Sequence, residues 1–439
     1  MAQPCYVNGQ KNASYRSRQI VVANAHSEAV IDTLSRAGAR PVVVDRGEDL
    51  GLTLLSVSNV TAATGELVDR TEPAHRARLP QAASADDLDP LLTALRAQFA
   101  GEHGGWRPTV GKNRYLGQVF GGDGIVNHGT GGRPSWTADD TPFPARTDGA
   151  GAGVVVGLLD TPIWPHRWLA GGWVGGPADQ LPDTGEYAPA DGHATFLTGL
   201  ILSQAPSARV LVRHVLPAGG QGAEAWTVAK EIVRLGNSGI DVLNLSLICQ
   251  TEDGDAPLTL RAAVDRVPPN VVIVAAAGNH GALSTDPVDG PPVLDPRSPA
   301  FPAALDRVIA VGASTRDGRI TPFTPRDAQW VELVALGDEV VSTYLDGAVR
   351  QDDHTVDLFT GWARWSGTSV SAALISGAIA ARVKPGTTPR DALRQLYHGR
   401  RIQPGGPGST WRPHLVDLGG PFASEPPADR LAHGLNRRA

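Results

Sequence analysis

Along residues 153–314, short and wholly apolar runs alternate with longer runs in which apolar positions recur at a helical period. A wholly apolar run of this length is typical of a strand that is buried on both faces of a sheet. The longer runs are typical of helices that cover such a sheet, so the alternation predicts a parallel α/β sheet. The predicted strands are residues 153–160, 208–216, 240–248, 270–278 and 307–314, and the predicted helices are residues 225–239 and 258–267.

A second, smaller α/β unit is predicted before this region. One helix begins at Ser27 and ends at Gly38, because a capping residue and a helix-ending glycine mark its two ends. Another helix, with an aspartate cap, is predicted at residues 85–100. The order strand, helix, strand, strand, helix is most of a ferredoxin-like order. Short β-branched runs that are typical of strands lie at residues 18–24, 39–46 and 50–58.

Shifts in composition divide the chain into four parts. Residues 121–152 are rich in Gly, Pro, Asp and Thr, which is typical of a linker. The last residues are rich in Pro, Gly and Arg, which is typical of a surface tail. We therefore expect a small α/β domain at 1–120, a linker at 121–152, a large α/β domain at 153–400 and a tail at 401–439.

Composition excludes several classes of protein. The net charge of −6 over 439 residues, with no basic stripe, argues against a nucleic-acid partner. Two cysteines, Cys5 and Cys249, are too few for a disulfide framework or a four-cysteine zinc site. No apolar run approaches the ~20 residues of a membrane-spanning helix. The N-terminal residues lack the apolar core of a secretory signal, so we expect a cytoplasmic protein.

Four polar residues lie where a parallel sheet gathers its functional groups, at the carboxyl ends of strands and the first turns of helices. Asp160 ends one predicted strand, and Asn279 follows another in a tight turn. His193 and Ser369 each begin a predominantly apolar, helical run. Each has an ordinary structural explanation when taken alone, as a turn former, a cap or a buried histidine. Their occurrence together is what indicates catalysis.

The four residue types have complementary chemistry. A serine hydroxyl becomes a nucleophile when an imidazole accepts its proton, and a carboxylate fixes the tautomer of that imidazole. An asparagine NH₂ group and a backbone N–H at a helix N-terminus can bind the resulting oxyanion. Gly367 lets a substrate approach the Ser369 backbone, and the small residues at 371–373 allow the helix to lie deep in the core.

The segments around these residues resemble the conserved blocks of subtilisin-like serine proteases, the subtilases. The resemblance implies a three-layer subtilisin-like domain with a mostly parallel central sheet. It also implies that Asp160, His193 and Ser369 form the catalytic triad, and that Asn279 binds the oxyanion. The segments are Leu159-Asp160-Thr161, Gly192-His193-Ala194-Thr195, Ala277-Gly278-Asn279 and Gly367-Thr368-Ser369, in the order in which the family has them.

The resemblance further implies two segments that flank a bound peptide or protein substrate. Ile248 stands where the family usually has glycine, which predicts a narrowed specificity pocket and a preference for small side chains. No calcium loop is evident, so we assign no metal and no cofactor, although family members often bind calcium. The implied substrate-binding residues are Gly220, Gln221 and Gly222 on one side, Leu245, Ser246 and Leu247 on the other, and Ala276 and Gly278.

The small N-terminal domain resembles subtilase propeptides in its order of elements. It is then either an intramolecular inhibitor and folding aid, removed by a cut in the linker near Arg146 or another exposed residue, or a permanent recognition module. Other departures from the family pattern, at Pro162, Ala194, Phe196 and Leu374, keep open a catalytically impaired, peptide-binding scaffold. Among active enzymes, the two alternatives are a cytoplasmic protease that processes one peptide or protein and a protease that degrades proteins broadly.

Overall fold

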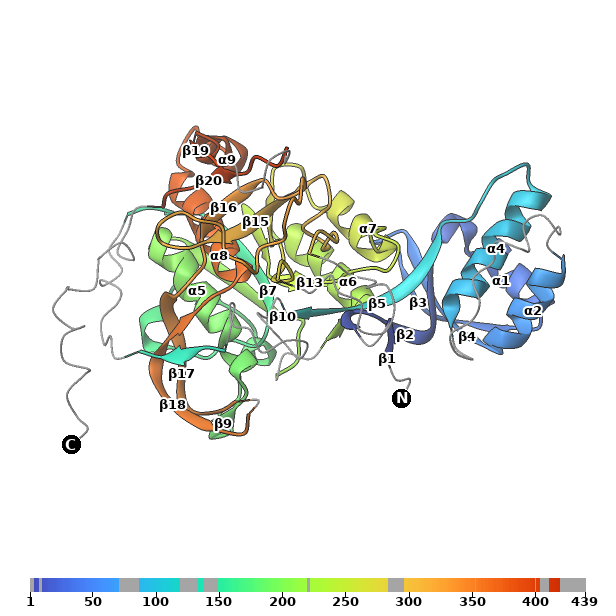
Figure 1. The fold of residues 1–439 in the computed structure, drawn as a ribbon, viewed down its shortest axis with the longest axis horizontal. Helices are drawn as coiled ribbons and strands as arrows, with labels where there is room; N and C mark the ends of the chain where they lie inside the picture. Colours follow the sequence, from blue (N-terminus) through green and yellow to red (C-terminus); the bar gives the residue numbers. More distant parts are fainter. Residues whose placement is uncertain are drawn as a thin grey trace.

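The computed structural model describes a large α/β domain and a small one beside it (Figure 1). The small domain extends from one end of the large domain, which makes the molecule elongated. The described residues are 4–7, 10–70, 87–118, 133–137, 149–218, 222–282, 296–351, 353–398, 400–402 and 410–418.

The central sheet of the large domain is mostly parallel, as the sequence predicted. Its described strands follow the order β19-β20-β16-β15-β14-β12-β7-β10-β8, and all of them except β19 run parallel. The five strands predicted from apolar runs are β7 (Val155–Asp160), β10 (Arg209–His214), β12 (Val242–Leu245), β14 (Val272–Ala276) and β15 (Val308–Ser314). The others are β8 (Trp173–Val174), β16 (Leu333–Leu336), β19 (Arg400–Arg401) and β20 (His414–Leu415).

Helices cover both faces of this sheet. Helices α5 (His193–Gln204) and α8 (Thr368–Arg382) pack on one face, and α6 (Ala225–Gly236) and α7 (Leu258–Arg266) pack on the other. Successive side chains of one strand enter different cores: Val242 packs with α5 and α8, whereas Leu243 packs with α6 and α7. Since both faces are buried, these strands are apolar at every position, and the domain has three layers.

A smaller sheet packs against α5 and leads into α8. Its described strands follow the order β6-β18-β17-β9, with β6 (Ser135–Trp136), β18 (Val356–Trp365), β17 (Val340–Arg350) and β9 (Glu186–Tyr187). Strand β17 is held against α5 by the Ser342 and Thr343 hydroxyls, which donate to the carbonyls of Phe196 and Thr195. Strand β18 ends at Trp365 and leads directly into α8.

The small domain contains the order β-α-β-β-α-β of a ferredoxin-like unit. Its antiparallel sheet has the order β5-β2-β4-β3, and β1 (Pro4–Val7) pairs with β2. The sequence predicted neither α2 nor β5. The elements are β2 (Gln10–Ala23), α1 (Ser27–Arg36), β3 (Arg40–Gly47), β4 (Leu52–Ser58), α2 (Val60–Arg70), α4 (Leu88–Glu102) and β5 (Val110–Gln118).

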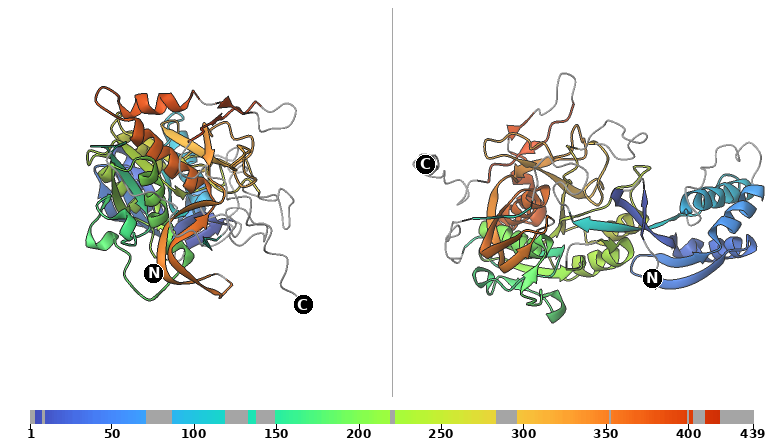
Figure 2. Two further views of the ribbon diagram at one scale, coloured as in Figure 1. Left: turned by 90° about the vertical axis from the view of Figure 1, so that its left-hand side faces the viewer. Right: turned by 60° about the horizontal axis from the view of Figure 1, so that its bottom comes forward.

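Strand β5 belongs to both domains. Its first half pairs with β2, and its second half enters the large domain between β11 (Ala223–Glu224) and β13 (Leu247–Ile248). Figures 1 and 2 show it as the long strand that crosses from one domain to the other. One sheet therefore spans the two domains.

Two expected boundaries differ from what the structure contains. Residues 410–418, assigned to the tail, contribute β20 to the central sheet and bury Trp411, so the sheet extends past residue 400. Burial of Trp411 and pairing with β16 fix this segment despite Pro413. Within the expected linker, residues 135–136 pair with β18, and most of the rest lies outside the described residues. No helix in the described part of the chain is long and apolar enough to cross a membrane.

Candidate active site

Asp160 and His193 form a buried hydrogen-bonded pair at the carboxyl end of the central sheet. The Nδ1 atom of His193 lies 2.7 Å from Asp160 Oδ1 and 2.9 Å from Oδ2. The Thr161 backbone N–H donates to the same carboxylate at 2.8 Å. Because a carboxylate accepts, Nδ1 carries the proton, and in the neutral ring Nε2 then holds the lone pair. The geometry therefore fixes the tautomer that a general base requires.

The start of α5 explains how His193 reaches this position. The Asp191 side chain accepts from the Ala188 N–H and closes the turn that leads into the helix. A Cβ on Gly192 would lie only 2.1 Å from the Tyr344 ring, so glycine is needed there for the turn to pack. Thr161 accepts from the Ala194 N–H and ties the helix start to the end of β7.

The second ring nitrogen of His193 is buried and, among the described residues, has no hydrogen-bond partner. The ring packs edge-on against Trp365, with centroids 5.4 Å apart. Trp365 is the last residue of β18, four positions before Ser369. The imidazole thus lies against the segment that begins α8, with its unpaired nitrogen buried in the same region.

Ser369 lies in the first turn of α8, next to Asn279. The Asn279 Oδ1 atom accepts from the Thr368 N–H at 2.9 Å and from the Thr368 hydroxyl at 3.0 Å. That hydroxyl in turn accepts from the Gly278 N–H at 3.0 Å. Asn279 thereby caps α8 from another segment of the chain, and its NH₂ group points away from these contacts.

The Asn279 NH₂ group and the Ser369 hydroxyl both lie close to Gly367. A Cβ at Gly367 would lie 3.2 Å from Ser369 Oγ and 3.3 Å from Asn279 Nδ2. The hydroxyl and the amide therefore border one space directly above the Gly367 backbone. The first N–H groups of a helix have no acceptor within it, so the Ser369 N–H faces the helix entrance as well. The space has the donors that an oxyanion needs.

The structure thus brings the four predicted residues together in two pairs. Asp160 is bonded to His193, and Ser369 lies beside Asn279. Trp365 and the packing of α5 against α8 bring the two pairs to one end of the sheet. Within the described residues, no hydrogen bond joins His193 Nε2 to the Ser369 hydroxyl.

Strand β5 lies between β11 and β13, and the place that it occupies is called the groove below. Its register places Gly117 opposite Ile248 and Gln118 opposite Leu247, and on its other edge Leu116 opposite Ala223. Because β5 is antiparallel to β13, it runs toward Ser246, the residue after Leu245. Leu245 pairs with Leu159, next to Asp160, so the strand runs toward the Asp160–His193 pair.

Of the predicted substrate-binding residues, Gly222 and Leu247 lie against β5, and Gly278 lies against Ile248, which pairs with β5. A Cβ on Gly222 would lie 3.2 Å from the Leu116 carbonyl, so its glycine permits the close approach of β5. Gly278, with φ +97°, would place a Cβ 2.8 Å from Ile248 Cδ1, which puts the bulky Ile248 against Gly278, next to Asn279. Leu245 and Ala276 end two central strands, and Leu247 pairs with β5. Gly220 and Gln221 lie outside the described residues.

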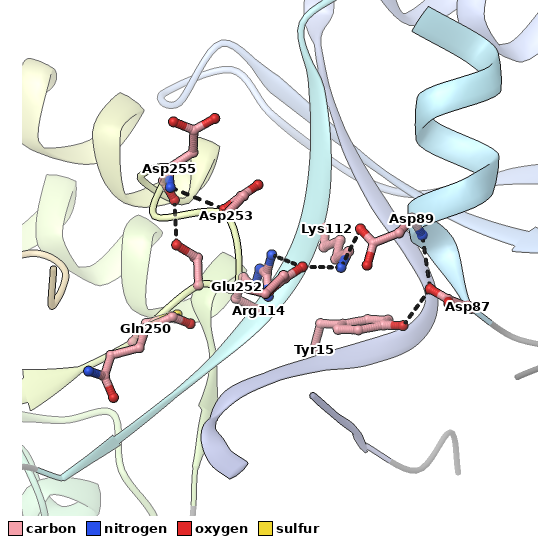
Figure 3. Close-up of polar contacts among 11 residues, drawn as sticks. Tyr15, Asp87, Asp89, Lys112, Arg114, Gln250, Glu252, Asp253 and Asp255 are labelled. Carbon is pink, nitrogen blue, oxygen red and sulfur yellow. Dashed lines mark hydrogen bonds and ion pairs between the residues drawn. The ribbon is translucent and has the colours of Figure 1, made fainter. Parts of the chain in front are cut away.

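An ion-pair cluster lies farther along β5 (Figure 3). Glu252, in the loop after β13, binds Arg114 through two hydrogen bonds of 2.5 and 2.8 Å. It also bonds the Lys112 ammonium, which reaches Asp89 at 2.6 Å. Burial raises the pKa of Glu252, but Arg114 and then Lys112 outweigh it and lower the pKa to about 2.

A second polar contact joins β5 to α6. The Asn113 Oδ1 atom accepts from the Trp226 N–H at 3.2 Å, and its NH₂ group donates to Glu224 at 3.0 Å. Glu224 also pairs with Arg16 of β2. The N-terminus of α6 has no cap from its own Glu224, so a side chain of the small domain provides one.

Sequence reasoning missed β5, Glu252 and Asn113 as parts of this region. The alternation in residues 110–116 is a strand signal, with Val110, Lys112, Arg114 and Leu116 on one face. This face is buried, but two of its four side chains are cations. The sequence pattern therefore lacks the apolar face by which a buried strand is usually predicted. Only the partner, Glu252, makes the pattern understandable.

Cys249 is fully buried beneath this cluster. Burial raises the pKa of its thiol to about 12, although the Arg114 charge opposes the shift. The thiol therefore stays protonated and behaves as a small apolar side chain. Among the described residues, no three His, Cys, Asp or Glu side chains are grouped to hold a metal ion.

Comparisons with known proteins concern mainly the large domain. A model of the subtilase family, peptidase S8, matches residues 151–398. The thermophilic serine proteinase of Bacillus sp. (strain AK1) is 28% identical over 258 residues, which are 51% of this chain and 59% of that protein. Subtilisin DY of Bacillus licheniformis is 31% identical over 206 residues, which are 44% of this chain and 68% of that protein.

A solved structure extends the likeness to the small domain. Fervidolysin from Fervidobacterium pennivorans, a keratinolytic enzyme related to subtilisin, matches 97% of this chain and 63% of its own with a TM-score of 0.58. At 16% sequence identity, this likeness concerns the fold alone. The chain spans about three fifths of the length of the thermophilic serine proteinase and of fervidolysin.

Proposed function

This chain belongs to the subtilase family, and from that premise we propose that it is a serine endopeptidase whose catalytic residues are Asp160, His193 and Ser369. The observation that carries the proposal is the buried bond from His193 Nδ1 to Asp160, which leaves Nε2 unpaired toward the Ser369 segment. A buried, unpaired nitrogen is costly, and a base that awaits a proton explains it.

In the proposed reaction, Ser369 Oγ attacks the carbonyl carbon of a peptide bond while its proton passes to His193 Nε2. Asp160 holds the imidazole and stabilises the imidazolium. The Asn279 NH₂ group and the Ser369 N–H bind the oxyanion above Gly367. His193 then returns the proton to the leaving amine, and water releases the acyl group by the same steps in reverse.

The missing bond between His193 Nε2 and the Ser369 hydroxyl is compatible with this mechanism. Rotation about a serine Cα–Cβ bond changes the direction of the hydroxyl between staggered positions. Catalytic hydrogen bonds are often long before substrate binds and tighten only in the complex. The same absence is the observation that favours the alternative, a scaffold that binds peptides without cutting them.

We also propose that the small domain is an intramolecular inhibitor. Strand β5 occupies the groove between β11 and β13, and it runs toward the catalytic centre. A peptide substrate would have to displace it. A cut after Gln118 would release the domain, whereas the alternative cut near Arg146 falls outside the described residues, as do the residues that follow Gln118.

A fluorophosphonate probe tests the catalytic proposal. We expect the probe to label the wild-type chain at Ser369, and to label neither Ser369→Ala nor, at a comparable rate, His193→Ala. Electrophoresis of the same samples distinguishes a processed enzyme from an intact chain with a permanent small domain. If a chain whose groove is opened by Leu116→Ala still takes no probe, the protein is a peptide-binding scaffold. The cytoplasmic location expected from the sequence remains a prediction.

A further inference from the structure

Glu252 binds the cationic side chains of an extended strand in the manner of a recognition pocket. The Arg114 guanidinium meets both carboxylate oxygens, which is the geometry that arginine offers and lysine cannot. The side chains of Arg114 and Lys112 are only 6% and 3% exposed, so both cations are largely shielded from water where they bind Glu252. Ion pairs that exclude water discriminate strongly between cationic and other side chains, because a buried carboxylate without a cationic partner is destabilising.

The strand that carries these cations is the same one that fills the groove. Arg114 lies two positions before Leu116, which is fully buried among apolar residues of the large domain. Two positions later the strand pairs with Leu247. Backbone pairing fixes the register, so any peptide that binds in this register presents one side chain at the place of Arg114, facing Glu252.

We infer that Glu252 forms an acidic subsite of the groove. This subsite selects peptides that carry an arginine two residues before the apolar residue that takes the place of Leu116. The inference rests on the proposed function, because it takes β5 to occupy the place of a substrate. The substrates of the groove are then cationic, extended peptides with the pattern Arg-x-Leu.

The surroundings of Glu252 make the place of Arg114 more selective than that of Lys112. Lys112 lies 4.4 Å from the centre of the Tyr15 ring and also binds Asp89, and both partners belong to the small domain. A separate peptide would lose them. Arg114 also lies over that ring, at 5.9 Å, but it bonds Glu252 of the large domain through two nitrogens, and the nearby Asp253 adds negative charge. A cation there is thus recognised by the groove itself.

Matched peptides added to the full chain test the subsite. Each has the sequence of residues 113–120 with a fluorescent label, and carries Arg, Ala or Glu at the place of Arg114. The chain carries Ser369→Ala to prevent cutting and Leu116→Ala to weaken its own strand. The remaining competition from β5 lowers every apparent affinity by the same factor, so the ratios of the dissociation constants report the subsite.

We expect the Arg peptide to bind about tenfold more tightly than the Ala peptide, and the Glu peptide to bind most weakly. Adding Glu252→Gln should bring the Arg and Ala peptides to within about twofold of each other. Asp255→Asn is the matched control, since it removes one charge from the same loop, where Asp255 takes part through its backbone. It should keep the Arg preference.

Equal binding of the three peptides, or no binding by any of them, would overturn the subsite. A preference for Arg that disappears equally in Asp255→Asn would overturn it as well, because the loop's overall charge would then be the cause. The proposed function stands or falls separately, on labelling of Ser369 in the wild-type chain by the fluorophosphonate probe.

Discussion

Strand β5 should leave the groove far more often when its buried anchor is shortened. Leu116 has no exposed surface and packs in the apolar core that contains Ala223, Trp226 and Leu247. We consider Leu116→Ala in a chain that also carries Ser369→Ala, so that no cutting can occur. The substitution leaves a cavity between β5 and the large domain, and nothing else in β5 replaces the lost contacts.

The size of the effect follows from burial. Leu→Ala substitutions in protein cores cost about 2–5 kcal/mol. The groove is at a domain boundary, where neighbours relax more easily than in a closed core, so we take the lower part of that range. A loss of ~2–3 kcal/mol increases the population of the undocked strand ~30- to 150-fold.

Hydrogen exchange measures this population directly, because amides exchange when their bonds open. We expect the amides of residues 115–118, and those of Leu247 and Ile248 opposite Gln118 and Gly117, to exchange ~30- to 150-fold faster than in the Ser369→Ala parent. Val43→Ala is the control, because Val43 is an exposed residue on β3 of the same domain. Unchanged exchange in Leu116→Ala would refute the idea that this side chain holds β5 in the groove.

Three further results are expected. Asn279→Ala should lower kcat about 10²- to 10³-fold with little change in KM, because it removes a donor that acts on the oxyanion, and an unchanged kcat in steady-state assays would exclude that role. The pKa of Glu252 is lowered from 4.5 to about 2 in the docked state, so its contribution to docking is complete above pH 4.5 and is lost as the pH falls toward 2. Exchange of the β5 amides, corrected for intrinsic rates, should therefore accelerate below about pH 4.5 and not between pH 5 and 8, and acceleration in the neutral range would assign the dependence to another group. Cys249, whose pKa is raised to about 12, should resist iodoacetamide at pH 8 in the native chain and react after unfolding, as peptide mass spectrometry would detect.

The central sheet could be predicted from the sequence because its strands are buried on both faces. Burial of this kind makes every position apolar, and the runs that became β7, β12 and β14 carry that signal without knowledge of their neighbours. The ends of those strands were also predictable, since polar residues must follow them. Asp160 and Asn279 were found by this reasoning, before any partner was known.

The groove was not predictable in the same way, because its occupant is defined by long-range pairs. Lys112 and Arg114 look like exposed cations until Glu252, more than a hundred residues later, is placed beside them. The same holds for β20, which follows a Pro- and Gly-rich stretch and joins the central sheet by pairing with β16. Local sequence patterns predict side chains that are buried by apolar contacts. They do not predict side chains that are buried by ion pairs with distant residues.

The two kinds of contact along β5 have different consequences for release. We expect the apolar burial of Leu116, which is insensitive to pH, to give docking its strength. We expect the bonds of Arg114 and Lys112 to Glu252 to fix which strand docks and in which register. A displacing peptide must match both, because an apolar residue alone would leave Glu252 half-buried without a cation. Under the inhibition that we propose, access to the groove depends on the sequence of the competing peptide as much as on its concentration.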